Sequence, residues 1–447
     1  MKPKTLLPLA ELYKFTSMFE SEEKAIKSNG ERGKPTQIEE DRKQIHQNRA
    51  DSMTNLWFCL PVYLLLRVCS LADAATTASE LSALAALKAT VVSSSIPPFS
   101  CIASWNFSGA GGSEPCRSFT CGISCSADGR ITAVALDPAG YSGHLPDAIS
   151  NLSHLETLDL SNNNFHGPIP SSLSSLTNLQ HLVLTSNSFT GQIPWSFSNL
   201  SSLKTLELAR NSFYGVIPSY LSSLSALAIV DLSYNRLSGP LPSSFPPNLV
   251  TLAIRGNLLT GSLIRSAFEP LQGLEVVDLA ENRLSGKLEG WLLRLPKIQQ
   301  VNLANNTFDK WEVWPAAGAS GEELVALDLG YNRIEGRLPA ELAGYPSLVA
   351  VTVSHNKLRG AIPWQYHREK KGVAFRRLFL DGNYLAGRVP AELVEAEVSG
   401  SFGDNCLEGC PPASTLCAKK QKPEWICRIL YCGGGGPRRR GNPCVFH

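Results

Sequence analysis

Apolar residues recur along this chain at intervals of 22 to 27 residues, most often 24, from Ile131 onward. The shared pattern is L-x-x-L-x-L-x-x-N-x-L-x-G-x-I/L-P, and eleven copies are in register. Their first apolar residues are Ile131, Leu155, Leu179, Leu203, Leu227, Leu249, Leu274, Ile298, Leu324, Leu348 and Phe375. Such regularity predicts one stacked array over most of the chain rather than several separate domains.

Each copy contains a short segment in which apolar and polar residues alternate. In T-L-D-L-S, Leu158 and Leu160 point to one face of a strand, while Thr157, Asp159 and Ser161 point to the other. One such strand per repeat, stacked in parallel, buries the leucines and exposes the residues between them. The pattern therefore predicts an α/β solenoid of about eleven 24-residue repeats, with a parallel sheet on its concave face.

The other fixed positions of the repeat have structural explanations. The Asn that follows each strand is expected to turn inward, where stacked copies bond to the backbone of neighbouring turns. The Gly permits an unusual backbone angle, and the Pro stiffens an extended segment. The predicted ladder consists of Asn163, Asn187, Asn211, Asn235, Asn257, Asn282, Asn306, Asn332, Asn356 and Asn383.

An array of this kind needs closed ends, because no repeat can bury its leucines alone. Before the first repeat, Thr77 and Glu80 have the spacing of a helix capping box. The residues behind them predict a helix whose apolar face is formed by Leu81, Leu84, Ala85 and Leu87. After the last repeat, N-C-L-E-G-C-P-P-A-S-T-L-C is expected to seal the other end.

The cysteines support two end caps, since none lies between Cys125 and Cys406. The cap cysteines are Cys101, Cys116, Cys121 and Cys125 on one side, and Cys406, Cys410, Cys417 and Cys427 on the other. Disulfides are favoured over zinc, because no His lies at ligand spacing beside either group. Four cysteines allow three pairings, and spacing alone does not choose among them.

A segment before the first cap is typical of export. The eleven-residue apolar run from Leu56 to Leu66 has the length of a signal-peptide core and is too short to span a bilayer. We hypothesise that Met53 is the initiator, and that residues 1–52 are a disordered leader or a gene-model extension. A signal anchor that is never cleaved is the alternative. Sequons for N-glycosylation at Asn106, Asn151, Asn199 and Asn305 also fit an exported protein.

The expected domains follow from these features. They are the leader (1–52), the signal-like segment (53–74), the N-terminal cysteine cap (75–130), the repeats (131–398), the C-terminal cysteine cap (399–430) and a flexible tail (431–447). After Cys427 there is no apolar stretch of about twenty residues, so no membrane anchor is expected after the repeats.

Composition and motifs argue for binding rather than catalysis. The net charge is +2, which gives no field that favours nucleic acid or an anionic membrane. We find no catalytic constellation, metal site or cofactor motif. G-A-G-G at Gly109 has neither the preceding strand nor the following helix of a dinucleotide loop. His367 and Glu369 lie in a three-residue insertion that is expected to be a solvated loop.

Over roughly residues 76–430 the sequence resembles the extracellular leucine-rich-repeat proteins of plants. These are receptor-kinase ectodomains, receptor-like proteins and polygalacturonase-inhibiting proteins. The resemblance rests on S-W-N-F-S…E-P-C-R-S-F-T-C-G-I-S-C, on the G-x-I-P repeat type, and on N-C-L-E-G-C-P-P…Q-K-P-E-W-I-C. It implies a twisted superhelix with a second sheet after the G-x-I-P turn, and a preferred Cys116–Cys125 bridge. Phe119 replaces the usual Trp of the N-terminal cap, Cys101 and Cys121 are additional, and the repeat from Ile298 loses G-x-I-P.

Any specificity must lie where the repeat varies, on the exposed face of the sheet. One candidate column is acidic, and a basic column follows the ladder Asn with Tyr or His two residues earlier. Together the candidate binding residues are Asp231, Tyr234, Arg236, Arg255, Asp278, Arg283, Asp328, Tyr331, Arg333, His355 and Lys357. The Arg residues are suited to carboxylates or sulfate on a peptide, or to an anionic pectin fragment. The alternative is that D-L-S and N-R-L are common repeat filler.

Trp311 and Trp314 lie in the irregular repeat, outside the leucine pattern. They are either an exposed interface anchor or a replacement for the lost G-x-I-P packing.

The leading functional hypothesis is a secreted recognition protein of the apoplast or cell wall, receptor-like and working with a membrane receptor kinase. The second is an inhibitor of a secreted wall-degrading hydrolase. Both act through a protein or peptide partner, without nucleic acid, cofactor or enzymatic activity. Association with the cell surface is the alternative location.

Overall fold

The computed structural model describes residues 76–108, 114–119, 121–316, 321–367, 375–395, 398–411 and 414–432 of the 447-residue chain. The predicted leader, the signal-like segment and the initiator Met53 lie outside these residues. So do Gly109 and Glu369, and all of the predicted tail except its first two residues.

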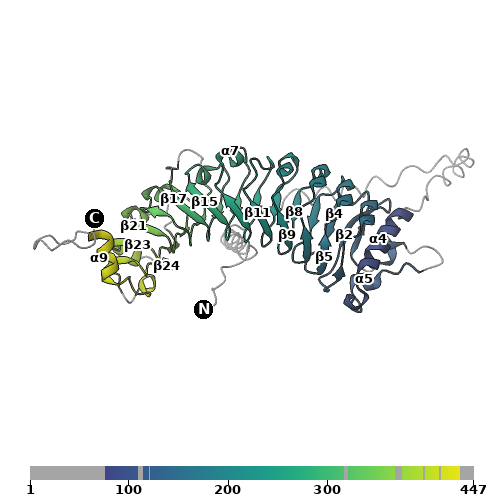
Figure 1. Ribbon diagram of the computed structural model, residues 1–447, viewed down its shortest axis with the longest axis horizontal. Helices are drawn as coiled ribbons and strands as arrows, with labels where there is room; N and C mark the ends of the chain where they lie inside the picture. The colour runs from purple at the N-terminus through teal and green to yellow at the C-terminus, as the bar shows by residue number, and fades with distance from the viewer. Residues whose placement is uncertain are drawn as a thin grey trace, which may run out of the picture. The chain divides into compact units, whose positions relative to one another are not determined.

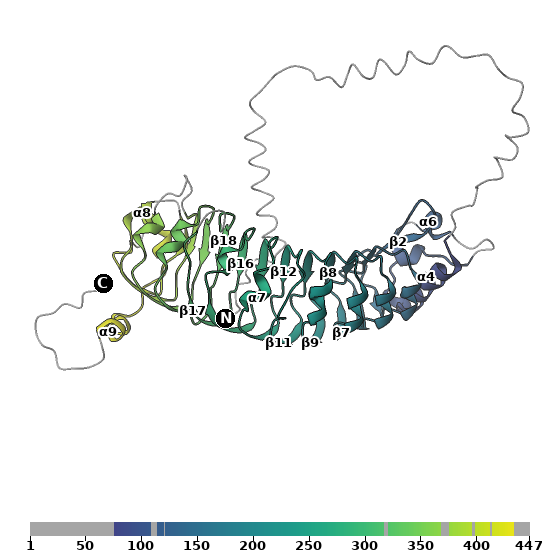
Figure 2. The ribbon, with the colours of Figure 1, turned by 90° about the horizontal axis from the view of Figure 1, so that it is seen from above.

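The repeats form a solenoid built on one long sheet, which confirms the predicted fold class (Figure 1). Its strands are parallel, apart from β1, which pairs antiparallel with β2 at the N-terminal end. In spatial order they are β1 (Ile123–Cys125), β2 (Ile131–Ala135), β4 (Thr157–Asp159), β6 (His181–Val183), β8 (Thr205–Glu207), β10 (Ile229–Asp231), β12 (Thr251–Ala253), β14 (Val276–Asp278), β16 (Gln300–Asn302), β18 (Ala326–Asp328), β20 (Ala350–Thr352), β22 (Arg377–Phe379) and β24 (Ser399–Ser401). Figure 2 shows this sheet on the inner side of the arc.

Stacking leucines hold this sheet together. Leu158 pairs in register with Leu182 and then Leu206 on successive strands. All three side chains are fully buried. Burial of each leucine contributes about 1.5–3 kcal/mol relative to an exposed side chain, and the array repeats that gain along its length.

A second layer of strands is present, as the family resemblance implies, but it lies before I/L-P and not after the G-x-I-P turn. Strands such as β7 and β9 follow the ladder Asn and end at the Gly of this motif. An eight-stranded sheet contains β3 (Ser142–Gly143), β5 (Asn164–Pro168), β7 (Ser188–Gly191), β9 (Ser212–Gly215), β11 (Arg236–Gly239), β13 (Leu258–Gly261), β15 (Arg283–Leu288) and β17 (Thr307–Trp311). A separate four-stranded sheet contains β19 (Glu335–Gly336), β21 (Lys357–Gly360), β23 (Tyr384–Arg388) and β25 (Cys406–Glu408). The break follows β17, in the repeat that loses G-x-I-P.

Short helices complete the turns behind the sheets. They are η2 (Asp147–Asn151), η3 (Ser171–Ser175), η4 (Trp195–Asn199), η5 (Ser219–Ser223), α7 (Arg265–Phe268), η6 (Leu292–Arg294), η7 (Ala340–Gly344), η8 (Trp364–His367) and α8 (Ala391–Glu395). A Pro at the end of I/L-P caps several of the 3₁₀ helices, because its fixed φ suits the residue before the turn.

The ladder Asn residues connect each turn to the one before it. The amide of Asn187 donates to the carbonyl of Leu160 at 2.8 Å, and its oxygen accepts the N–H of Phe165 at 2.9 Å. The same pair of contacts recurs at Asn211 and at each later ladder position. Each Asn therefore satisfies backbone groups of the preceding repeat that water does not reach.

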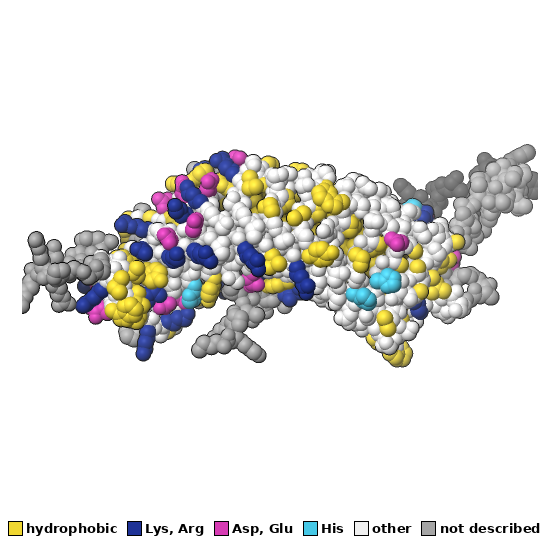
Figure 3. Space-filling view, viewed as in Figure 1, with side chains coloured by type: hydrophobic (Ala, Val, Ile, Leu, Met, Phe, Trp, Pro, Cys, Tyr) yellow, Lys and Arg dark blue, Asp and Glu magenta, His cyan; other side chains and the backbone are white. Residues whose placement is uncertain are grey.

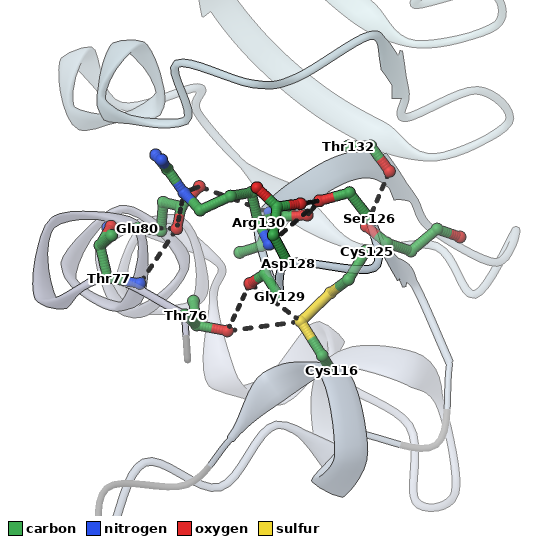
Figure 4. Close-up of a disulfide and its surroundings, with 12 residues drawn as sticks. Thr76, Thr77, Glu80, Cys116, Cys125, Ser126, Asp128, Gly129, Arg130 and Thr132 are labelled. Carbon is green, nitrogen blue, oxygen red and sulfur yellow. Dashed lines mark hydrogen bonds and ion pairs between the residues drawn. A yellow bond between two sulfur atoms is a disulfide. The ribbon is translucent and has the colours of Figure 1, made fainter. Parts of the chain in front are cut away.

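The N-terminal cap contains α4 (Ala78–Thr90), η1 (Ser93–Ser95), α5 (Cys101–Ser104) and α6 (Pro115–Ser118). The predicted capping box is present, and the fully buried carboxylate of Glu80 also accepts from Arg130 Nε at 3.1 Å (Figure 4). Cys116 bonds to Cys125, the preferred pairing, and Cys101 bonds to Cys121. Trp105 is fully buried and stacks on Phe119, with ring centroids 5.6 Å apart. An aromatic pair therefore fills the centre of this cap.

At the other end, the array continues past the boundary at residue 399 that the sequence suggested. Strand β24 pairs with β22, and Asn405 makes the ladder contacts to Leu385 and Leu380. The pattern concealed this turn because Gly400 stands opposite Leu378, where a leucine was expected. The cap beyond it contains η9 (Thr415–Cys417) and α9 (Glu424–Cys432), with disulfides Cys406–Cys427 and Cys410–Cys417.

Candidate ligand-binding surface

The candidate binding residues fall into three rows that run across the stacked repeats. The strand row lies in the main sheet and contains Asp231, Asp278 and Asp328. The turn row precedes each ladder Asn and contains Tyr234, Tyr331 and His355. The rim row follows each ladder Asn and contains Arg236, Arg283, Arg333 and Lys357. Arg255 belongs to none of the three rows.

Each carboxylate of the strand row accepts a hydrogen bond from the backbone N–H two residues later. The donors are Ser233 to Asp231 at 3.0 Å, Ala280 to Asp278 at 3.1 Å and Gly330 to Asp328 at 2.9 Å. Asp159 accepts from Ser161 in the same way. These aspartates therefore bind backbone groups where the strand ends, a structural role that D-L-S shares across repeats.

Burial also disfavours the charged form of the carboxyl groups in the strand row. Burial raises the pKa of Asp278 and that of Asp328 to about 6. Burial also raises the pKa of Asp231, and burial together with Asp231 and Asp159 raises that of Glu207. The inner sheet therefore carries acidic groups whose charge changes between neutral and mildly acidic pH.

Arg255 and Asp278 are not open to a ligand, which corrects their assignment to an exposed surface. Arg255 is only 5% exposed and Asp278 only 2%. Arg255 Nη2 lies 2.5 Å from Glu281 Oε1, and its Nη1 lies 3.9 Å from Asp278 Oδ2. Small residues such as Ala280 and Ala304 occupy the position of Arg255 in the next repeats, and they are buried too. The position itself is therefore closed, and an Arg there needs internal partners.

The turn row is a series of stacked planar groups held in the left-handed backbone region. Tyr234 has φ 55°, and Tyr331 and His355 both have φ 54°. The rings of Tyr331 and His355 stack at 4.4 Å between centroids. The guanidinium carbon of Arg210 lies 4.7 Å from the centroid of the Tyr234 ring. Arg210 thus extends the row by one repeat.

Two glycines make room for these rings. A Cβ at Gly256 would lie 2.6 Å from Tyr234 Cδ1, and one at Gly382 would lie 2.5 Å from His355 Nδ1. Both glycines occupy the turn-row position of the following repeat, with φ 67° and 72°. The sequence signal for these positions is the Gly directly before the ladder Asn in R-G-N and D-G-N, which the pattern of charged residues does not reveal.

The rim row is the exposed cationic part of the surface. Arg236, Arg283 and Lys357 open strands of the second layer, and all four rim side chains are exposed. Lys357 pairs with Glu335 at 3.1 Å. Within the described residues, no carboxylate lies within 4.0 Å of the guanidinium groups of Arg236, Arg283 or Arg333. These three groups are available to a ligand.

Figure 3 shows how the charges are distributed over one face of the solenoid. Lys, Arg, Asp and Glu side chains gather over the half that contains β15, β17 and β21, whereas the half from β2 to β9 is mostly uncharged. A ligand recognised by charge would therefore contact the later repeats.

The four sequon asparagines are all exposed: Asn106, Asn151, Asn199 and Asn305. Asn305 lies in the turn-row position between Glu281 and Tyr331.

The tryptophans of the irregular repeat make internal contacts. Trp311 donates to the carbonyl of Arg337 at 3.3 Å, and Trp314 accepts at its carbonyl from Tyr345 at 2.7 Å.

No helix in the described ranges is both long and apolar enough to cross a membrane. Nor do the described residues contain a group of three or more His, Cys, Asp or Glu side chains arranged to hold a metal ion.

Comparison with known proteins points to one family. Models of the leucine rich repeat match residues 154–176, 177–237 and 247–308. Receptor-like protein 35 of Arabidopsis thaliana is 36% identical over 134 residues, which are 29% of this chain and 14% of that protein.

Two solved structures have a similar fold. The crystal structure of PEPR1–AtPEP1 has a TM-score of 0.66 and 30% identity, over 74% of this chain and 45% of that chain. The plant peptide hormone receptor RGFR1 in complex with RGF2 has a TM-score of 0.55 and 29% identity, over 60% of this chain and 42% of that chain. This chain therefore spans less than half the length of each of the three relatives.

Proposed function

We propose, from its membership of the plant extracellular leucine-rich-repeat proteins, that this chain is a secreted receptor-like protein that binds an acidic peptide along its rim row. The bound ligand then recruits a membrane receptor kinase. Among the relatives, PEPR1 and RGFR1 are complexed with AtPEP1 and RGF2. None of the three relatives described above is named as a hydrolase inhibitor, so the inhibitor hypothesis has no support from them.

The observation that carries the proposal is the spacing of three guanidinium groups that have no carboxylate within 4.0 Å in the described part of the chain. Arg236, Arg283 and Arg333 occupy alternate repeats, with Leu258 and Thr307 between them. Because strands in a sheet lie about 4.8 Å apart, these groups recur about every 10 Å along the array. A polyproline-II peptide advances about 9.3 Å per three residues, so carboxylates at every third position meet successive Arg side chains.

The turn row supplies the second half of the surface. The Tyr331–His355 stack and the Arg210–Tyr234 pair present flat groups beside the cationic rim. Rigid aromatic side chains are common at the centres of protein interfaces. Stacking fixes them before a ligand arrives, which reduces the entropy lost on binding.

The direct test measures binding of the secreted chain to (Pro-Pro-Glu)₄ and (Pro-Pro-Gln)₄ by titration calorimetry. The acidic peptide should bind, and the neutral peptide should bind at least about tenfold more weakly. Arg283→Glu/Arg333→Glu should abolish binding. Arg359→Glu/Arg388→Glu is the matched control, because it makes the same charge change at exposed second-layer positions. Equal affinity for both peptides, or full affinity in the rim variant, would refute the proposal.

A second experiment tests the biological partner and the secretion of the chain. The secreted protein is used to capture proteins from a wall extract, with and without the rim variant. If the wild-type protein captures a receptor kinase and the rim variant does not, the result supports the receptor-like function. If both proteins capture a hydrolase, the result favours the inhibitor function. N-terminal sequencing of the same secreted protein should place its start after Met53, and a start upstream of Met53 would overturn that hypothesis.

A further inference from the structure

A cavity of about 310 Å³ lies among the helical segments behind the sheets, away from the three rows. Its wall includes Arg265 from α7, Trp291 and Arg294 beside or within η6, and Trp314 after β17. These residues come from three consecutive repeats, which start at Leu249, Leu274 and Ile298. The cavity is therefore separate from the surface proposed above.

The cavity exists because these three repeats depart from the regular pattern. Instead of I/L-P they read S-L-I-R after Gly261, K-L-E-G-W after Gly286, and D-K-W-E-V-W after Phe308. Trp314 lies directly against Gly290, where a Cβ would come within 2.5 Å of its Cγ. Gly290 thus permits the indole to lie in this position. The ring of Trp291, 7% exposed, packs on Phe268 at 5.8 Å.

The charges around the cavity are unequal. Arg265 Nη2 pairs with Glu269 at 2.9 Å, and its guanidinium carbon lies 5.7 Å from the Trp314 ring centroid. Arg294 has no carboxylate within 4.0 Å among the described residues. Glu269 also lines the cavity, but its charge is paired with that of Arg265. The lining therefore offers one guanidinium, that of Arg294, without a carboxylate partner among the described residues, and it lies beside two tryptophans.

We propose that this cavity binds a small carboxylate carried on a single flat ring. The guanidinium of Arg294 provides two parallel donors in the geometry that a carboxylate accepts. Trp314 and Trp291, which both line the cavity, provide the apolar surface for the ring. A volume of about 310 Å³ is at the lower end of the range of ligand pockets, which is enough for one ring and a short acidic side chain.

The test titrates the full secreted chain with phenylacetate and with phenylacetamide, followed by calorimetry. Phenylacetate should bind, and phenylacetamide, which has the same ring without the charge, should bind at least about tenfold more weakly. Arg294→Gln should weaken phenylacetate binding by at least about tenfold, because it removes the charged fork. Arg333→Gln is the control and should leave this binding unchanged.

Three results would overturn the proposal: no phenylacetate binding, equal binding of the amide, or a loss below tenfold in Arg294→Gln. The comparison of acid with amide uses the unmodified chain, so it remains decisive even if the variant does not fold. The rim variant Arg283→Glu/Arg333→Glu separates the two sites. This variant should no longer bind the acidic peptide but should still bind phenylacetate. The two proposals are therefore tested independently.

Discussion

The guanidinium of Arg255 donates to the carboxylate of Glu281 in the next repeat, with Nε and Nη2 lying 3.2 and 2.5 Å from one oxygen. Asp278 lies on its other side, and Asp278 Oδ2 has no hydrogen-bond partner among the described residues. One buried cation therefore lies between a buried carboxylate, that of Asp278, and a partly exposed one, that of Glu281. Removing this cation leaves an acidic group with little water and no nearby positive charge.

Arg255→Met should consequently destabilise the protein by about 2–4 kcal/mol at pH 7, because it isolates Asp278. Denaturant unfolding followed by circular dichroism measures this loss. The double variant Arg255→Met/Asp278→Asn should recover most of the stability, since it removes the isolated charge while the amide oxygen keeps the hydrogen bond from the N–H of Ala280. Arg236→Met, at an exposed rim position, is the matched control and should change stability by less than about 0.5 kcal/mol. A double variant no more stable than Arg255→Met would contradict this account.

The strand row predicts an unusual pH dependence. The pKa of Asp278 and that of Asp328 are raised by burial from 3.8 to about 6, so between these values the folded protein binds more protons than the unfolded chain. Stability should therefore rise as the pH falls from about 6 to 4, by on the order of 3 kcal/mol per group at most.

Asp278→Asn and Asp328→Asn should each flatten this dependence, because the amide oxygen keeps the backbone hydrogen bond without titrating. Unfolding free energies at pH 4, 5, 6 and 7 check the prediction. Glu80 gives an internal contrast. Burial alone would raise its pKa, but hydrogen bonds from Arg130 and Thr77 outweigh burial and hold it below the ordinary value. Its contribution is present above that value and is lost as the pH falls further. A pH dependence that both Asn variants share unchanged with the wild type would show that the strand row does not titrate in this range.

The sequence predicted the positions that every repeat shares, and it missed contacts that occur in only one repeat. The leucines and ladder Asn were predictable because they recur at fixed spacing and each has one stable location. Arg255 and Arg236 looked alike in the sequence, since both are Arg residues within two positions of a ladder Asn. Packing separates them, because Arg255 lies before the turn in a closed position and Arg236 lies after it in the solvent. Glu80 was predicted as a capping residue, but its partner Arg130 is 50 positions away and no periodicity connects them.

The ladder should be costly to interrupt in the middle of the array. In Asn282→Ala, the N–H of Leu259 loses its acceptor, which lies at 3.1 Å in the wild type. The carbonyl of Ile254 loses one of its two donors and still accepts from the amide of Asn257 at 3.1 Å. An unsatisfied buried group costs about 1–3 kcal/mol, so the loss of the Leu259 partner predicts a loss of about 1–3 kcal/mol in denaturant unfolding. Asn178→Ala is the control, because Asn178 is exposed and makes a single bond to Ser153. Equal losses in the two variants would argue against the ladder as a source of stability.

Gly256 tests the turn row. In Gly256→Ala, the new methyl group would meet the Tyr234 ring at 2.6 Å while the backbone keeps its φ of 67°. Steric overlap and the left-handed conformation together should cost about 2–3 kcal/mol. Tyr234→Ala/Gly256→Ala relieves the overlap and leaves only the backbone strain, so it should be more stable than the two single losses added together. Gly344→Ala, where no atom lies within 4 Å of the added methyl group, should be nearly neutral. If the stability losses of the two single variants simply added up in the double variant, Tyr234 would not lie over Gly256. The proposal of a rigid, stacked turn row would then be contradicted at this repeat.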